Sequence, residues 1–171
     1  MVTTKDIQIL DMFMQEHNIP YVLTGTAALM VHGILPEGYI ADDIDIIVLV
    51  NQNEDSNKYF TVEKTLKQLE LLSGEEKNAD YNSVITFKVN GVKVNAFMGG
   101  RMISILEARD SNNYIGGFGE KGHYNKIMIN NTFFVKVSDV ACILAAKFRL
   151  KRIKDYKFAK DLVSTILNIG F

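Results

Sequence analysis

Apolar and polar positions recur along this chain with two different periods, which predict an interleaved set of helices and strands. Helical spacing over residues 4–17 places Ile7, Leu10 and Met14 on one face, with Thr4 able to cap the helix. Similar patterns predict helices at 27–33, 59–72, 140–151 and 155–168, and a short helix or turn after Arg101. Apolar runs and alternation predict strands at 21–23, 43–50, 83–89, 92–98, 126–129 and 132–137.

Turn residues separate these segments and predict how they connect. Pro20 ends the first helix, and Gly33 closes the second. Asn90-Gly91 predicts a tight hairpin, and Asn130-Asn131 predicts a second one. Residues 117–122 match Gly-x-Gly-x-x-Gly, but no strand precedes them, so we interpret them as a loop.

This order of elements predicts an α+β fold, a small mixed β-sheet flanked by helices with a C-terminal helical pair. We expect one domain over residues 1–171, with a core at about 1–137 and closing helices at about 138–171. A length of 171 residues, with 47% apolar and 23% charged residues, is ordinary for one globular domain. No apolar run approaches the ~20 residues of a membrane helix, and the N-terminus lacks the features of a secretory signal. With Cys142 as its one cysteine, the chain is expected in the cytoplasm, without a membrane partner.

Charge is unevenly distributed although the net charge is only −1. Between Lys147 and Lys160 seven basic residues stand against Asp155 alone, so the rest of the chain is acidic. Such a segment suits an anionic substrate, but a solvated helix face has the same composition. Helical spacing places Lys147 on the apolar face of its helix, where it could reach a phosphate. Asp155 also lies on a packing face, where it could cap its helix, pair with Lys147 or Arg152, or act in a site.

Two carboxylates two positions apart, Asp43 and Asp45, stand at the start of an apolar strand. Alternate residues of a strand share a face, so both carboxylates would point to one place. Such a pair can hold a hard divalent cation with a substrate phosphate on its far side. Solvated acids at the mouth of a strand are the alternative for an isolated Asp-x-Asp.

The turn Thr24-Gly25-Thr26 joins the strand at 21–23 to the following helix. Gly25 allows backbone to approach a ligand closely, and the free N–H groups at a helix start favour an anion. The hydroxyls of Thr24 and Thr26 add donors. Together with the downstream carboxylates, the turn predicts a phosphate cradle facing a metal site.

These segments resemble the signature of the nucleotidyltransferase fold of the DNA polymerase beta superfamily. The resemblance lies in the Thr24-Gly25-Thr26 turn with its helix and in Asp43-Ile44-Asp45. The closest branch contains small bacterial proteins, including nucleotidyltransferase-type toxins and antibiotic-modifying nucleotidyltransferases. Its closing helices carry a Lys…Arg-x-Lys-Asp pattern, which is matched here by Lys147, Arg152, Lys154 and Asp155.

The resemblance implies a protein that binds a nucleoside triphosphate with Mg²⁺ or Mn²⁺. Asp43 and Asp45 would ligate the metal, and the turn from Thr24 to Thr26 would hold phosphate. Lys147 and Arg152 would neutralise charge, and the remaining residues of the closing-helix pattern would complete the nucleotide site. The reaction would transfer a nucleoside monophosphate to a hydroxyl of a small molecule, a protein or RNA.

The sequence departs from the family pattern at three places. Thr24 replaces the first glycine of the turn, and the loop between Gly33 and Asp43 lacks an arginine that often precedes the carboxylates. Asn95 stands where a third carboxylate is usual, and its amide brings no negative charge. Two alternatives therefore remain: a degenerate member that binds nucleotide or a partner without turnover, and a nucleic-acid binder using the basic closing helices.

Overall fold

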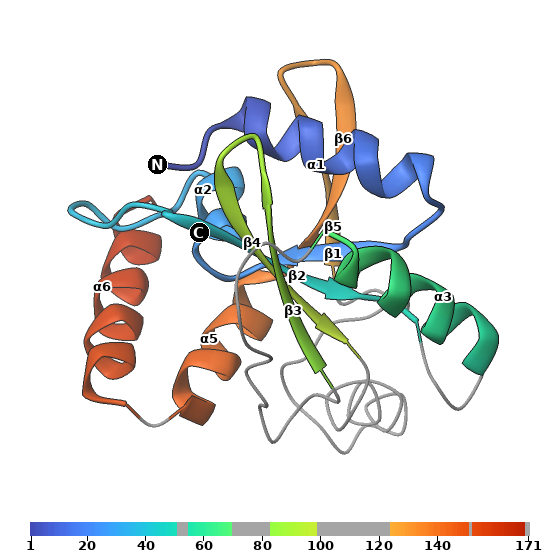
Figure 1. The fold of residues 1–171 in the computed structure, drawn as a ribbon. Helices are drawn as coiled ribbons and strands as arrows, with labels where there is room; N and C mark the ends of the chain where they lie inside the picture. The colour runs from blue at the N-terminus through green and yellow to red at the C-terminus, as the bar shows by residue number, and fades with distance from the viewer. Residues whose placement is uncertain (51–54, 70–82, 99–123, 151, 170–171) are drawn as a thin grey trace.

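One mixed β-sheet forms the centre of the molecule, and helices pack around it. The structure is a computed structural model that describes residues 1–50, 55–69, 83–98, 124–150 and 152–169 (Figure 1). Within these residues the sheet has six strands in the order β3-β4-β2-β1-β6-β5. The strands are β1 (Tyr21–Thr24), β2 (Asp43–Val48), β3 (Ser83–Val89), β4 (Val92–Met98), β5 (Tyr124–Ile129) and β6 (Phe133–Ser138). The helices are α1 (Thr4–Glu16), α2 (Gly25–His32), α3 (Ser56–Lys67), α5 (Val140–Leu150) and α6 (Ile153–Ile169).

The pairing of the strands brings distant parts of the chain together. Strand β2 runs antiparallel to β1 on one side and parallel to β4 on the other. Strand β1 pairs in parallel with β6, and β3–β4 and β5–β6 are antiparallel hairpins. The predicted α+β class and mixed sheet are therefore confirmed.

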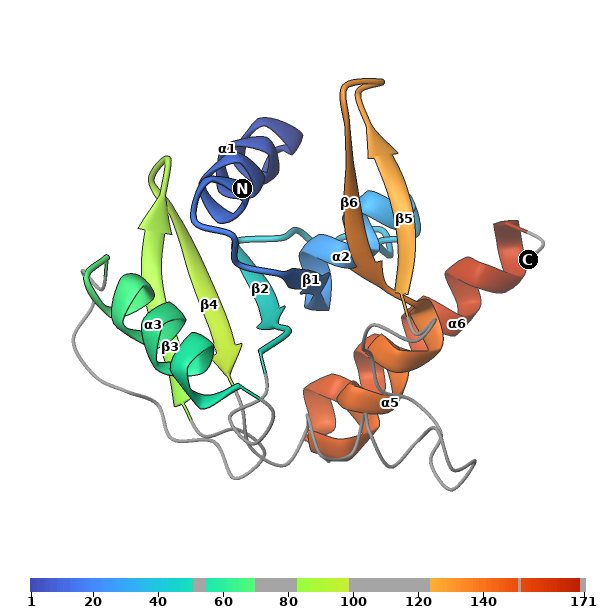
Figure 2. The ribbon, with the colours of Figure 1, turned by 90° about the vertical axis from the view of Figure 1, so that its right-hand side faces the viewer.

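Burial alternates along β4 and along the first half of β2, so one face of the sheet packs into the core there and the other carries polar side chains. Ile44 and Ile46 on β2, Val94 on β4 and Phe87 on β3 are fully buried. The ring of Phe13 in α1 lies 6.5 Å from that of Phe87, so α1 covers this core face. In two perpendicular views, α3 lies beside the β3–β4 hairpin, and α5 and α6 lie together on the far side of the molecule (Figures 1 and 2).

Helix ends and turns follow local chemistry, with one correction to the expected caps. Thr3, rather than Thr4, caps α1, because its side chain accepts from the backbone N–H of Asp6 while the Asp6 carboxylate accepts from the N–H of Thr3. In the β3–β4 turn, Asn90 and Gly91 have φ values of 51° and 78°, as a tight hairpin requires. Gly33 ends α2 in the left-handed region, as predicted.

Element boundaries differ from the expected ones by a few residues. Strand β2 ends at Val48 rather than at residue 50, and α3 begins at Ser56 because Asp55 caps it through a 3.0 Å bond from the N–H of Lys58. That helix ends at Lys67, with Gln68 as its C-cap, rather than at the predicted residue 72. The short helix or turn predicted after Arg101 and the loop predicted at 117–122 lie outside the described residues. Among the described helices, none is long and apolar enough to cross a membrane.

Candidate functional site

A row of four polar residues crosses the polar face of the sheet on four neighbouring strands. The strand registers pair Thr24 with Asp45, Asp45 with Asn95, and Asn95 with Thr86. Side chains of register partners point to the same face of a sheet. Asp43, two positions before Asp45, shares that face and completes the expected carboxylate pair.

Asn95 connects the two carboxylates to each other. Its Nδ2 donates to Asp45 Oδ1 at 2.9 Å and to Asp43 Oδ2 at 3.3 Å. Its Oδ1 accepts a hydrogen bond of 3.0 Å from the hydroxyl of Thr86. Asp43, Asp45 and Asn95, which the sequence predicted as catalytic, therefore form one hydrogen-bonded group, and in it Asn95 presents a donor to the carboxylates.

The surroundings of Asp45 disfavour its charged form. Burial raises the pKa of Asp45 from its ordinary value of 3.8 to about 6, and repulsion from Asp43 acts in the same direction. The hydrogen bond from Asn95 and the positive charges of Lys147 and Lys93 offset part of this shift. A group that favours the charged carboxylate, such as a cation, would therefore be stabilised here.

The start of α2 lies against this carboxylate. Gly25 has φ +67°, and a Cβ added to it would lie 2.7 Å from Asp45 Oδ2, which is closer than real Cβ atoms approach. Thr24 is buried and stands at the N-cap of α2, yet its side chain makes no capping hydrogen bond. The first N–H groups of a helix have no partner within it, so the start of α2 offers donors beside the carboxylate pair. The predicted turn is thus the end of β1 and the first two residues of α2, which begins at Gly25 rather than at residue 27. Gly25 lies against Asp45, one of the two predicted carboxylates.

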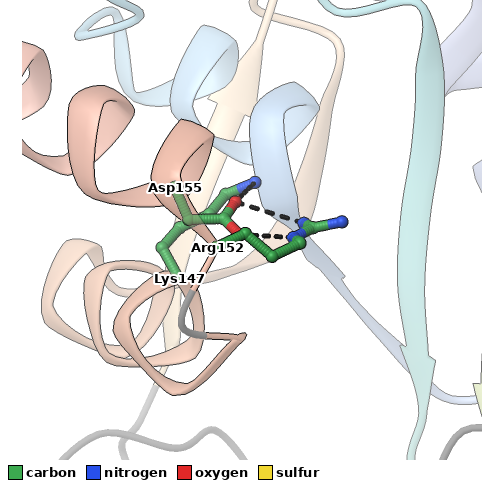
Figure 3. A network of polar contacts seen from close by, with 3 residues as sticks. All are labelled: Lys147, Arg152 and Asp155. Carbon is green, nitrogen blue, oxygen red and sulfur yellow. Dashed lines mark hydrogen bonds and ion pairs between the residues drawn. The ribbon is translucent and has the colours of Figure 1, made fainter.

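The closing helices are joined by ion pairs to one buried carboxylate, that of Asp155 (Figure 3). Asp155, 3% exposed, accepts from Arg152 through two bonds, one of them 3.1 Å from Nη2 to Oδ1. Lys147 Nζ lies 4.0 Å from Asp155 Oδ1 and 5.1 Å from the ring centre of Phe158. Of the roles left open for Asp155, pairing with both cations is the one observed. Two cations of the basic segment are therefore engaged in this pair, which reduces what a nucleic-acid face could use.

The remaining predicted residues differ in their surroundings. Lys147 belongs both to the ion pair and to the electrostatic surroundings of Asp45, so it links the closing helices to the site. Arg152 is held by Asp155, and Lys154 is exposed on α6. Thr26 is half-buried within the first turn of α2.

The donor set is adequate for one hard cation. Within the described residues no group of three or more acidic, histidine or cysteine side chains could hold a metal. Each carboxylate nevertheless has one oxygen, Asp43 Oδ1 and Asp45 Oδ2, that accepts no hydrogen bond from the described residues. Mg²⁺ is often held by one or two carboxylates together with substrate phosphates, so this pair fits such an ion when a phosphate accompanies it.

Sequence reasoning missed Thr86, although a signal for it was present. A tight turn at Asn90-Gly91 fixes the register of its hairpin, and that register places Thr86 opposite Asn95. The hydroxyl of Thr86 is the group that holds the Asn95 amide on the side away from the carboxylates.

Comparisons with known proteins agree on the fold. No protein-family model matches the sequence, and no curated protein matches it at a significant level. Among solved structures, TM1012 from Thermotoga maritima, assigned as a nucleotidyltransferase, is 13% identical with a TM-score of 0.50, over 96% of each chain. ANT(2")-Ia in complex with adenylyl-2"-tobramycin is 13% identical with a TM-score of 0.51, over 98% of this chain and 91% of its own. The solution structure of the antibiotic-resistance factor ANT(2'')-Ia is 12% identical with a TM-score of 0.50, over 96% and 89%.

At this level of identity the likeness concerns the fold, which is also the fold that the resemblance in the sequence implied. The chain therefore has the nucleotidyltransferase fold.

Proposed function

We propose that this protein binds a nucleoside triphosphate with Mg²⁺ or Mn²⁺ and transfers a nucleoside monophosphate to a hydroxyl group. Asp43 and Asp45 would hold the cation, and Thr24, Gly25 and Thr26 at the start of α2 would hold phosphate. The observation that supports the proposal is the approach of Gly25 to Asp45, because the N–H groups at the start of a helix favour an anion and here they lie next to one of the two carboxylates. Lys147 would neutralise phosphate charge from the closing helices.

The transfer would proceed by substitution at the α-phosphorus. The acceptor oxygen forms a bond to that phosphorus, the bond from phosphorus to the α–β bridging oxygen breaks, and pyrophosphate leaves. The bound cation would stabilise charge on the phosphate oxygens. The hydroxyl proton would pass to solvent, because the Asn95 amide has no basic atom to accept it. Positioning and charge neutralisation would supply most of the rate enhancement.

Asn95 makes slow turnover, or binding without turnover, the main alternative. Its Nδ2 faces both carboxylates, so the third position contributes neither negative charge nor a base. A nucleotide-binding protein without catalytic activity would retain the turn, the pair and Lys147. Only an active protein needs an acceptor, which would be a small molecule, a protein or RNA.

Labelled nucleoside triphosphates, Mg²⁺ or Mn²⁺ and a cell extract test the proposal. We expect label to transfer to an acceptor, Asp43→Asn to abolish transfer, and Asp42→Asn, an exposed neighbour, to preserve it. Transfer by Asn95→Asp but not by the unaltered protein would establish a binding protein that lacks only the third acid. Transfer that persists in Asp43→Asn would place the reaction elsewhere.

A further inference from the structure

Asn95 presents its donor group to the two carboxylates that would bind a cation. Its Nδ2 bonds both Asp45 Oδ1 and Asp43 Oδ2. An N–H group carries partial positive charge, so it competes with a cation for the same oxygens. The Oδ1 atom of the same amide, which can ligate a hard cation, instead accepts from Thr86 on the other side.

We propose that the Asn95 amide reverses when the carboxylate pair binds a divalent cation. Oδ1 then faces the cation as a third oxygen ligand, and Nδ2 donates to the hydroxyl of Thr86. This inference rests on the proposed function, because it requires Asp43 and Asp45 to bind the cation.

Thr86 is the positioning residue that permits both orientations. A threonine hydroxyl carries one donor and two acceptor lone pairs. It now donates to Asn95 Oδ1 at 3.0 Å, and by rotating its hydrogen it can accept from Nδ2 after the reversal. Neither orientation then leaves the half-buried amide with an unpaired polar atom, which would cost free energy.

Reversal of the amide also requires little space. The two ends of an asparagine amide are nearly equal in size, and rotation about χ2 exchanges them without moving the backbone. The backbone of Asn95 is held between Asp45 on β2 and Thr86 on β3 by the sheet register. A side-chain rotation is therefore the change that the surrounding strands allow.

The direction of the change in Mn²⁺ affinity in Asn95→Ala separates the two possible roles of the amide. If the reversed amide is a ligand, removing it weakens Mn²⁺ binding. We expect a loss of about tenfold or more, because mutations even of the groups around metal ligands have effects of that size. If the amide only competes for the carboxylates, removing it tightens binding, which would overturn the inference. Mn²⁺ binding is measured by electron paramagnetic resonance with a non-hydrolysable triphosphate present, and thermal unfolding verifies that each variant is folded.

Thr86→Val provides a second test, with Thr86→Ser as its matched control. Valine removes the group that accepts from Nδ2, so we expect weaker Mn²⁺ binding, while serine keeps the hydroxyl and the affinity. Mg²⁺ should also produce a nuclear Overhauser contact between the Asn95 side-chain amide protons and Thr86. Mg²⁺ binding without this contact, or valine and serine variants of equal affinity, would contradict the reversal.

Failure of the proposed function gives a different result. In that case the unaltered protein would not bind Mn²⁺, or Asp43→Asn would bind it equally well. Either result overturns both ideas. Binding that requires Asp43 but tightens in Asn95→Ala overturns the reversal alone.

Discussion

At the scale of single residues, Gly25 and Asp45 depend on each other. The backbone of Gly25 has φ +67°, and Asp45 Oδ2 occupies the position next to its missing side chain. Any larger residue would both strain the backbone and displace the carboxylate. The carboxylate, in turn, is kept close to the start of α2, where the N–H groups favour negative charge.

Gly25→Ala should therefore weaken Mn²⁺·nucleotide binding by more than about tenfold, an effect of the size seen for displaced groups around metal ligands. Gly33→Ala is the matched control. Gly33 has a similar φ of +74°, but a Cβ there meets nothing within 4 Å. We expect the control to lose about 1 kcal/mol of stability from backbone strain while it binds normally. Equal binding by the two variants in titration calorimetry would show that the contact with Asp45 does not matter.

Asp45 also predicts a pH dependence of stability. Its pKa is raised by burial to about 6, above its ordinary 3.8. The folded protein therefore holds a proton on Asp45 that the unfolded chain releases between about pH 4 and pH 6. Stability attributable to this group falls as the pH rises through that window, by up to about 3 kcal/mol, and is constant above it.

Asp45→Asn should remove this fall and stabilise the protein at pH 7–8 in the presence of a chelator. Denaturant unfolding from pH 4 to pH 8 measures the effect as the difference between the variant and the unaltered protein. Asp42→Asn, at an exposed carboxylate, is the control for the loss of one negative charge. If the variant is less stable than the unaltered protein at pH 8, burial of the charged Asp45 carboxylate does not destabilise the protein.

At the scale of elements, the junction between α5 and α6 depends on one buried carboxylate. Asp155 is 3% exposed and pairs with Lys147 from α5 and Arg152 before α6. Removing one partner of a buried pair leaves uncompensated charge behind. Both cations retain partial access to water, with side chains 22% and 48% exposed, so the cost is moderated.

Asp155→Ala should accordingly destabilise the protein by about 2 kcal/mol. Lys157→Ala, at an exposed position of the same helix, should change stability by less than about 0.5 kcal/mol. Thermal unfolding of both variants measures the difference. If Asp155→Ala is as stable as Lys157→Ala, the ion pair does not hold the two helices together.

Also at the scale of elements, local patterns predicted much of the structure, and non-local pairing could not be predicted. Periodicity and turn residues identified the helices and both hairpins, because those signals lie within a few neighbouring residues. The Asn90-Gly91 turn also determines the register that pairs Thr86 with Asn95. The parallel pairing of β2 with β4 joins segments separated by a long crossover, which no local signal specifies. The hydrogen bonds from Asn95 to the carboxylates follow from that pairing and needed the structure.

At the scale of the whole molecule, the sheet topology assembles the site from four separated segments. Strand β2 lies between β1 and β4, which brings the junction of β1 with α2 and Asn95 of β4 to either side of Asp45. Lys147 of α5 adds a positive charge from the C-terminal part of the chain. The site therefore exists only in the folded sheet with its closing helices, so cation binding and folding should be coupled.

Asp43 and Asp45 are proposed to bind a divalent cation together with a nucleotide. Electron paramagnetic resonance of Mn²⁺, titrated with and without a non-hydrolysable triphosphate, measures this binding most directly. We predict that the unaltered protein binds Mn²⁺ more tightly with the triphosphate than without it, and that Asp43→Asn loses this binding while Asp42→Asn retains it. Binding that is unaffected by Asp43→Asn, or no binding by the unaltered protein, would contradict the claim.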